Sequence, residues 1–552
     1  MSPQSLLDRI GDWSAGLRYG LLTVVALAFL LPGITSLPPI DRDESRFAQA
    51  SKQMVESGDY VDIRFQDQPR HKKPAGIYWF QAAAVHLTGI DDRIWVYRLP
   101  SLGAAIASVL LTAVIGGMLF GSGVGFGAGI VMASSILLNV EARTGKSDAM
   151  LLAAILAALA CLLFVLRRRG GSSLPAHGFW AMAGVGFMIK GPIVFLPIIG
   201  ISLAQGWLSR GIGWVRDLKP LTGIPLFLVV ALPWYVAIII ISDGGFLAES
   251  VGKDMIAKVA GGQESHGAPP GLYLALANVT FWPFSLLGLL ALPWIWRSRR
   301  RSEVTLLLGW ALFTWIIFAL TPTKLAHYVL PAYPALAILA VAALHDVDAA
   351  APRWWRFVVM VLWGLVTLAL AGAMPFVGAG AGVDLSIWHF AGVLLLPALW
   401  FGLTFIHGTR RSGAQLTTVL VAALLFSGVV FGRFLPGLEP AFVSPRLAAA
   451  FRTALAPCPT PRLISAGFNE PSLVFLTATD TVLTHATGAA DKLLDGTPCQ
   501  IAAIESRLQA DFLDRIAAAG AEVEKLDEVQ GFNYARGRNV TITLYRLAGN
   551  SR

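Results

Sequence analysis

The sequence predicts a polytopic α-helical membrane protein with about 13 transmembrane helices and a small C-terminal α/β domain. Three observations carry this prediction. Of the 552 residues, 55% are hydrophobic and only 14% are charged, whereas soluble globular chains carry roughly 25% charged residues. Many apolar runs approach the roughly 20 residues that a helix needs to cross a bilayer. The expected division is a membrane domain at 1–432 and an extramembrane domain at 433–552.

Thirteen apolar runs are expected to span the membrane. The first run lacks a small-residue cleavage site, so we interpret it as an anchor and not as a cleaved signal. The two runs around Pro192 are hard to separate. The runs lie at 18–36, 94–117, 122–138, 148–166, 177–190, 191–208, 220–241, 274–296, 303–320, 328–345, 354–373, 387–406 and 415–432.

Basic residues orient this stack of helices. Sixteen Lys and Arg residues fall on one side of the membrane, and by the positive-inside rule that side is the cytoplasm. An odd number of spans then places the loops 37–93 and 242–273 and the C-terminal domain outside. The residues are Arg9, Arg18, Arg167, Arg168, Arg169, Arg210, Arg216, Lys219, Arg297, Arg299, Arg300, Arg301, Arg353, Arg356, Arg410 and Arg411.

The C-terminal segment alternates short strand-like and helix-like pieces, which is typical of a small α/β domain. Strands are expected at 463–466, 481–484, 501–504 and 540–545, and helices at 489–495 and 506–519. Cys458 and Cys499 both lie in this segment. They either pair, if the domain faces an oxidising compartment, or remain two free thiols. Cys161 lies in an apolar run and is interpreted as a core residue.

Charged residues cluster in the first outward loop. Asp43 and Glu44 start an amphipathic segment that continues to Ser57. The functional interpretation is that an acid here serves as a base; the structural alternative is that Asp43 caps a helix. Lys72 and Lys73 follow in the same loop. They either bind lipid headgroups or hold a phosphate.

Further polar residues recur at the outward ends of the predicted helices. They are Asp148, Lys190, Lys324, Tyr328 and Tyr333. Ionisable residues at membrane depth are costly and are therefore candidates for function, although a Lys at such a place can also extend its amine to the interface. Acids and cations on one water-facing surface suit a phosphorylated lipid and a base.

These residues resemble the motifs of the GT-C superfamily of polyprenyl-phosphate-sugar-dependent membrane glycosyltransferases. The superfamily includes protein O-mannosyltransferases and the bacterial aminoarabinose transferase of lipid A. The resemblance rests on the order and common side of several short motifs over essentially the whole chain. They are Asp41 to Arg46, Lys72-Lys73-Pro74 with Tyr78-Trp79, Arg143 to Asp148, Lys190-Gly191-Pro192, and Lys324 to Tyr328 with Pro331 and Tyr333.

The resemblance implies an inverting transfer of a sugar from an undecaprenyl-phosphate donor to a lipid or glycan acceptor. Lipid A, as part of lipopolysaccharide, or another envelope glycan is the expected acceptor. The implied place is the bacterial inner membrane, with the site and the C-terminal domain facing the periplasm. Asp43, Glu44 and Asp148 are the candidate catalytic residues. The candidate donor-phosphate ligands are Arg46, Lys72, Lys73, Lys190, Lys324, Tyr328 and Tyr333.

One position departs from the family pattern. In the aminoarabinose transferase an acidic residue precedes the Lys that matches Lys73, and here Lys72 stands in its place. In the family, that acid belongs to a metal site. His266 corresponds to another residue of the same site. The sequence therefore predicts that no metal is required. The same change disfavours an aminoarabinose donor, because an extra cation favours an acidic sugar or a different pose of the phosphate.

A transporter or flippase of a lipid-linked substrate is the main alternative, and a scaffold protein is a third. A transporter predicts repeat symmetry and broken helices near the midplane, whereas the ionisable residues here gather at the outer helix ends. The sequence leaves open which sugar and which acceptor are used and how many copies of the chain assemble. The charge pattern excludes a nucleic-acid partner, because such a footprint clusters on one soluble face.

Overall fold

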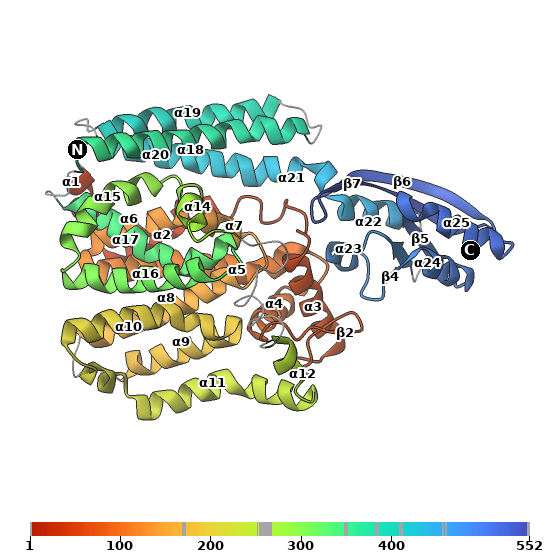
Figure 1. The fold of residues 1–552 in the computed structure, drawn as a ribbon, viewed down its shortest axis with the longest axis horizontal. Helices are drawn as coiled ribbons and strands as arrows, with labels where there is room; N and C mark the ends of the chain where they lie inside the picture. The colour runs from red at the N-terminus through yellow and green to blue at the C-terminus, as the bar shows by residue number, and fades with distance from the viewer. Residues whose placement is uncertain are drawn as a thin grey trace.

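The computed structural model describes residues 3–167, 173–250, 252, 268–346, 351–380, 386–407, 412–454, 458 and 461–548. A large assembly of roughly parallel and antiparallel helices makes up most of the molecule, and a smaller sheet domain from the C-terminal residues projects from one end of it (Figure 1). His266 lies outside the described residues, as do Arg168, Arg169, Arg410 and Arg411.

The large assembly forms one continuous apolar core. Close packing of α5 and α6 illustrates how small residues allow it: a Cβ atom on Gly125 would lie 2.2 Å from the carbonyl oxygen of Ala113. The elements are α1 (Pro3–Gly11), α2 (Ala15–Leu30), α5 (Ile94–Phe120), α6 (Ser122–Ser134), α7 (Ile136–Ala142), α8 (Asp148–Arg167), α9 (Leu174–Lys190), η1 (Gly191–Val194), α10 (Phe195–Ser209), η2 (Gly213–Leu218), α11 (Pro220–Ile241), α12 (Gly245–Leu247), α14 (Leu272–Thr280), α15 (Ser285–Ser298), α16 (Ser302–Leu320), η4 (Ala326–Ala332), α17 (Tyr333–His345), α18 (Arg353–Gly380), α19 (Ser386–His407), α20 (Ser412–Val429), η5 (Val430–Phe434) and α21 (Leu435–Gly437).

Eight helices of the described residues are long and apolar enough to cross a membrane. The pair α6 and α7, bent by 65°, adds a ninth if it is one span. The structure thus confirms a polytopic helical membrane protein, but it does not confirm the expected count of 13. Several expected runs are short or broken: α2 has 16 residues, and the run 274–296 is divided between α14 and α15.

The first outward loop is structured. It contains α3 (Asp43–Ser57), a hairpin of β1 (Arg64–Phe65) and β2 (Gln68–Pro69), and α4 (Gly76–Thr88). The amphipathic segment expected from Asp43 to Ser57 is α3, which ends at Gly58 in a left-handed conformation. In Figure 1, α3 and α4 lie between the membrane helices and the C-terminal sheet.

The C-terminal residues form a five-stranded sheet in the order β4-β3-β5-β7-β6. β3 pairs in parallel with β4 and β5, and β7 pairs antiparallel with β5 and β6. One face packs on α22 and the other on α24 and α25, which confirms the expected α/β domain. The elements are η6 (Glu439–Ala441), α22 (Val443–Ala454), β3 (Arg462–Ala466), α23 (Pro471–Leu476), β4 (Val482–Thr484), α24 (Ala486–Leu494), β5 (Gln500–Glu505), η7 (Ser506–Leu508), α25 (Gln509–Ala518), β6 (Val523–Asn533) and β7 (Arg538–Leu547).

The cysteines separate as one pair and one free thiol. Cys458 and Cys499 form a disulfide with a Cα–Cα distance of 5.9 Å. Cys161 is a free, partly buried thiol in α8. Of the two alternatives for the C-terminal cysteines, the structure therefore contains the paired one.

Candidate active site

A cavity of about 1160 Å³ lies where the first outward loop meets the ends of the membrane helices. The start of α3, the loop after β2, the loop between α7 and α8, the end of α9 and the segment before η4 contribute to its wall. Eight of the ten candidate residues line it. They are Asp43, Glu44, Arg46, Lys72, Lys73, Asp148, Lys190 and Tyr328.

Asp43 is the first residue of α3 and is exposed to this cavity. The residue at the N-cap position is Arg42, so Asp43 is not the helix cap of the structural alternative. In the part of the chain that the structure describes, the Asp43 carboxylate accepts no protein hydrogen bond. Arg46 lies one turn further along α3 and also lines the cavity. A carboxylate without a protein partner, beside cations, keeps its capacity to accept a proton from a substrate.

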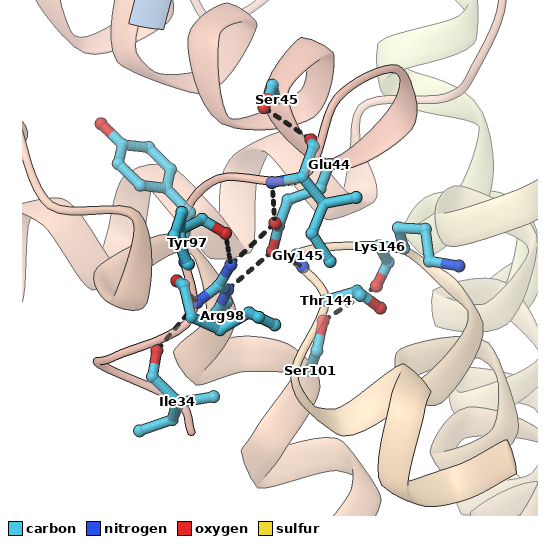
Figure 2. Close-up of polar contacts among 12 residues, drawn as sticks. Ile34, Glu44, Ser45, Tyr97, Arg98, Ser101, Thr144, Gly145 and Lys146 are labelled. Carbon is cyan, nitrogen blue, oxygen red and sulfur yellow. Dashed lines mark hydrogen bonds and ion pairs between the residues drawn. The ribbon is translucent and has the colours of Figure 1, made fainter. Parts of the chain in front are cut away.

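The next acid, Glu44, is in a different situation. Figure 2 shows it in a buried pair with Arg98 of α5. The Nε and Nη2 atoms of Arg98 lie 2.7 and 2.8 Å from the two carboxylate oxygens. The carboxylate also accepts the backbone N–H groups of Ile40 at 2.9 Å and Gly145 at 2.8 Å. With four donors around it and 1% exposure, Glu44 is placed to hold α3 in position, and its contacts speak against the catalytic role expected for it.

Arg98 extends this connection to the segment that precedes α3. Its guanidinium donates to the carbonyl oxygens of Ile34 at 3.0 Å, Leu37 at 2.7 Å and Pro38 at 2.9 Å. Planar guanidinium groups suit such simultaneous contacts, because their five N–H donors have fixed directions. The Glu44–Arg98 pair therefore joins the start of α3, the segment 34–40 and the loop at Gly145. Sequence reasoning missed Arg98, since it lies inside an apolar run.

Asp148 and Lys190 form a second pair, with 2.5 Å between Oδ1 and Nζ. Beside it, the Lys146 amine lies 2.9 Å from the Glu141 carboxylate. His327 lies between both pairs, 3.9 Å from each carboxylate. Burial lowers the pKa of Lys146, but the Glu141 and Asp148 carboxylates outweigh this and raise it, so Lys146 remains charged. These contacts engage Asp148 and Lys190 with each other, and neither is an isolated base or cation.

The loop after β2 contributes cations from the opposite wall. Arg70 donates from Nε to the Tyr78 hydroxyl at 3.1 Å and stacks on the Phe47 ring at 5.2 Å. Lys72 is exposed and Lys73 is partly buried, and all three cations line the cavity. Burial raises the pKa of the Tyr78 hydroxyl, and the Arg70 charge opposes this shift. The sequence predicted Lys72 and Lys73 here; it missed Arg70, which stands in the same basic run and could have been included.

Two candidate phosphate ligands do not reach the cavity wall. Lys324 donates to the carbonyl oxygens of Ala319 at 2.9 Å and Phe318 at 3.3 Å, at the end of α16. It satisfies carbonyl groups that a helix C-terminus leaves without partners. Tyr333 is fully buried, with its hydroxyl on Thr280 and its ring against Phe281. Tyr328 does line the cavity, and the Lys190 amine lies 5.8 Å from its ring centre.

Metal ligands are not assembled in the described part of the chain: no group of three or more His, Cys, Asp or Glu side chains there could hold an ion. His266, the family-matched candidate, lies outside the described residues. The expectation that no metal is required therefore stays a prediction.

The sequence is similar to a described protein family and to several known transferases. Residues 72–236 match the family described as dolichyl-phosphate-mannose-protein mannosyltransferase. An undecaprenyl phosphate-alpha-4-amino-4-deoxy-L-arabinose arabinosyl transferase 2 of Pseudomonas fluorescens is 25% identical over 492 residues, which cover 86% of this chain and 82% of that protein. A transferase of the same kind from Aeromonas salmonicida is 27% identical over 344 residues, 60% of each chain.

Solved structures show the same fold. ArnT from Cupriavidus metallidurans bound to undecaprenyl phosphate superposes with a TM-score of 0.76 at 19% identity, over 98% of this chain and 100% of that one. The archaeal oligosaccharyltransferase AglB from Archaeoglobus fulgidus gives 0.50 at 9% identity, over 89% and 69% of the two chains. The structural matches confirm the fold class, and the family match and the sequence relatives confirm the expected resemblance and the enzyme class.

Proposed function

We propose that this chain, a membrane glycosyltransferase of the GT-C type with a mannosyltransferase-family match over residues 72–236, transfers a sugar from an undecaprenyl-phosphate donor with inversion of configuration. The acceptor is a lipid or glycan at the outer face of the inner membrane, such as lipid A. The observation that carries the proposal is the cavity itself, whose wall holds both the Asp43 carboxylate, which has no hydrogen-bond partner among the described residues, and cations from a second loop. The names of the relatives supply the donor class.

Asp43 is assigned the role of general base. Of the three candidate acids, Glu44 is held by Arg98 and Asp148 by Lys190, whereas Asp43 has no protein partner in the described structure. As the acceptor oxygen bonds to the anomeric carbon, its proton passes to the Asp43 carboxylate. The bond between that carbon and the phosphate oxygen breaks, and polyprenyl phosphate leaves with the electron pair. A positioned base typically contributes 10²- to 10⁴-fold to such a rate.

Cations of the cavity wall are assigned to the phosphate. Arg70, Lys72 and Lys73 come from the loop after β2, and Arg46 comes from α3. Positive charge fixed near the leaving oxygen stabilises the charge that develops there. Charge-assisted hydrogen bonds to phosphate are among the stronger ones in proteins. Lys190 contributes through its pair with Asp148, which orients its amine beside Tyr328.

The periplasmic orientation of the site is part of the proposal. The sixteen Lys and Arg residues named above are expected on one side of the membrane, which the positive-inside rule assigns to the cytoplasm, and the loop that contains α3 is expected on the other side. The Cys458–Cys499 disulfide supports an oxidising compartment for the C-terminal domain. A lipid-linked donor suits that side of the membrane, since its polyprenyl chain keeps the sugar at the bilayer surface.

The charge of Lys72 affects which donor sugar the site accepts. It is exposed at the cavity beside Lys73, in the position where the family carries an acid. Like charges a few ångströms apart disfavour each other, so an ammonium-bearing sugar would meet a penalty here. We therefore assign the donor a neutral or acidic sugar, unlike the amino sugar in the relatives' names.

The decisive experiment uses purified protein in lipid nanodiscs with a labelled undecaprenyl-phosphate sugar and lipid A as acceptor. Transfer predicts free undecaprenyl phosphate and labelled acceptor, both absent when the acceptor is left out. Asp43→Asn is the matched control, because it keeps the side-chain shape. In a parallel reconstitution into sealed vesicles, movement of intact donor across the bilayer without release of undecaprenyl phosphate would instead support a flippase.

A further inference from the structure

The C-terminal domain contacts the helix that begins with Asp43. α23 lies against α3, and its Phe475 side chain, 1% exposed, inserts between α3, α4 and α5. The Phe475 ring meets Tyr97 edge-on, with 5.3 Å between ring centres. Full burial of one aromatic side chain on a neighbouring domain stabilises their contact through the hydrophobic effect. The domain is therefore seated on α3 by a specific apolar anchor.

Polar contacts continue this interface along α3. Thr479, in the loop before β4, accepts the Gln49 amide at 2.8 Å and donates to the Glu56 carboxylate at 2.7 Å. Its carbonyl oxygen accepts the Gln66 amide at 3.0 Å. Because these partners lie one to four turns into α3 and in the β1–β2 turn, they fix the orientation of the helix as a whole.

A second group of contacts holds the two residues immediately before Asp43. The Asp41 carboxylate accepts the Ser472 hydroxyl, and also the Ser472 backbone N–H at 3.3 Å. The Asp41 backbone N–H donates to the Tyr534 hydroxyl at 2.7 Å. The Arg42 guanidinium donates to the carbonyl oxygen of Ala535, in the turn between β6 and β7.

The backbone at Arg42 has an unfavourable conformation that these contacts support. Arg42 has φ 70° and ψ −111°, and its side chain makes no capping hydrogen bond to α3. A non-glycine residue in a sparsely populated conformation is strained and persists only where its surroundings enforce it. The Glu44–Arg98 pair holds this turn from one side, and the C-terminal domain holds it from the other.

We propose that Ser472 and Tyr534 of the C-terminal domain are positioning residues for the transfer reaction: by holding Asp41 they fix the strained turn at Arg42 and so direct the Asp43 carboxylate into the cavity. The inference rests on the proposed function, in which Asp43 is the base. The C-terminal domain then acts as a part of the catalytic apparatus, although Ser472 and Tyr534 are absent from the residues lining the cavity.

The test compares Ser472→Ala, Tyr534→Phe and their double variant in the full-length protein in nanodiscs. Two readouts are measured: amide hydrogen exchange of residues 40–46, and kcat with the KM for the undecaprenyl-phosphate sugar. The matched controls are Ser506→Ala, at an exposed site of the same domain, and Tyr545→Phe, whose hydroxyl contacts Gln509 inside the domain. They remove the same atoms without touching Asp41.

We expect the double variant to exchange faster at residues 40–46, while the amides of the C-terminal sheet keep their protection. Two hydrogen bonds lost from a positioning contact correspond to about a 10-fold fall in kcat, with the donor KM changed less than about 2-fold. Ser472→Thr, which keeps the hydroxyl, should retain both protection and kcat.

Unchanged exchange at residues 40–46, or faster exchange with an unchanged kcat, would overturn the proposal. So would an equal fall in kcat for the two control variants, which would indicate a general loss of domain stability. A wild-type protein that transfers no sugar counts against the proposed function instead. The exchange data alone would then decide whether the domain holds the turn.

Discussion

Glu44 and Asp43 are adjacent acids, and the structure predicts opposite consequences when each is changed to its amide. In Glu44, one carboxylate oxygen accepts from Arg98 Nε and the Gly145 N–H, and the other from Arg98 Nη2 and the Ile40 N–H. A Gln side chain has one N–H₂ group, which must face two of these four donors in either orientation. Glu44→Gln therefore leaves two buried donors without an acceptor and the Arg98 charge without its carboxylate counter-charge.

The size of the effect follows from these contacts. Removing one partner of a buried, hydrogen-bonded ion pair costs about 3–5 kcal/mol. The exposed Asp43 carboxylate has no such partners in the described part of the chain, and exposed substitutions of this kind change stability by roughly 0.5 kcal/mol or less. We thus expect Glu44→Gln to lower the melting temperature clearly. Asp43→Asn should melt like the wild type while its kcat falls by about 10²- to 10⁴-fold.

The assay measures thermal unfolding and sugar transfer on the same nanodisc preparations of the two variants. Arg98→Met should resemble Glu44→Gln in stability, because it breaks the same buried ion pair and leaves the Glu44 carboxylate without its cation. A Glu44→Gln protein with wild-type melting and no transfer would refute the positioning role and return Glu44 to the catalytic candidates. Near-normal transfer by Asp43→Asn would remove the assignment of Asp43 as base.

Four further predictions concern the cavity and its surroundings. Lys73→Ala should weaken donor binding by about 10- to 150-fold, the equivalent of one charge-assisted contact, measured by titration with the undecaprenyl-phosphate sugar; unchanged affinity would argue against a phosphate contact. Lys72→Glu should raise kcat/KM for an amino-sugar donor relative to a neutral one, and a ratio equal to that of the wild type would contradict the sugar assignment. Burial raises the pKa of Asp41 from its ordinary 3.8 to about 6, with the Ser472 hydrogen bond opposing and Glu470 adding to the rise; the docked domain therefore binds this proton more tightly, and its stability falls as the pH rises from about 4 to about 6. Asp41→Asn should abolish that dependence in the exchange of residues 40–46, and an identical pH profile would show that another group titrates. Transfer should survive chelation by EDTA, whereas loss of turnover restored by zinc would show that a metal is required.

The sequence was sufficient for the fold class and for most of the cavity wall. Hydropathy identifies the helical runs, because a lipid environment leaves few alternatives for an apolar segment. Asp43 and Lys73 of the first outward loop line the cavity together with Asp148, Lys190 and Tyr328 from the outward helix ends, whereas Lys324 and Tyr333 do not. The number of spans was less predictable: α14 and α15 form one apolar run in the sequence, and only the structure shows where it breaks.

Pairing between distant residues could not be predicted. Asp148 and Lys190 are 42 positions apart, and nothing in their local sequence says that they neutralise each other. Lys324 stands four residues before Tyr328, yet its amine turns back to the carbonyl groups that end α16. β6 escaped the strand prediction because its residues are mostly charged or polar, as suits an edge strand that pairs on one side only.

The assignment of roles to the acids follows from their surroundings and not from their identity. A carboxylate that accepts four hydrogen bonds, as Glu44 does, has its lone pairs committed, and a new proton would displace a donor. Asp148 is held by an ammonium group at 2.5 Å. Asp43 accepts no hydrogen bond from the described residues and so keeps its lone pairs for the substrate, but a side chain without such bonds is poorly directed by itself. Direction must then come from the backbone that carries it, and this backbone is held on one side by Glu44 and Arg98 and on the other by Ser472 and Tyr534. A base that can accept a proton, on a turn that is held from both sides, is both reactive and correctly placed. In this proposal, the membrane enzyme therefore needs contacts from a domain outside the bilayer.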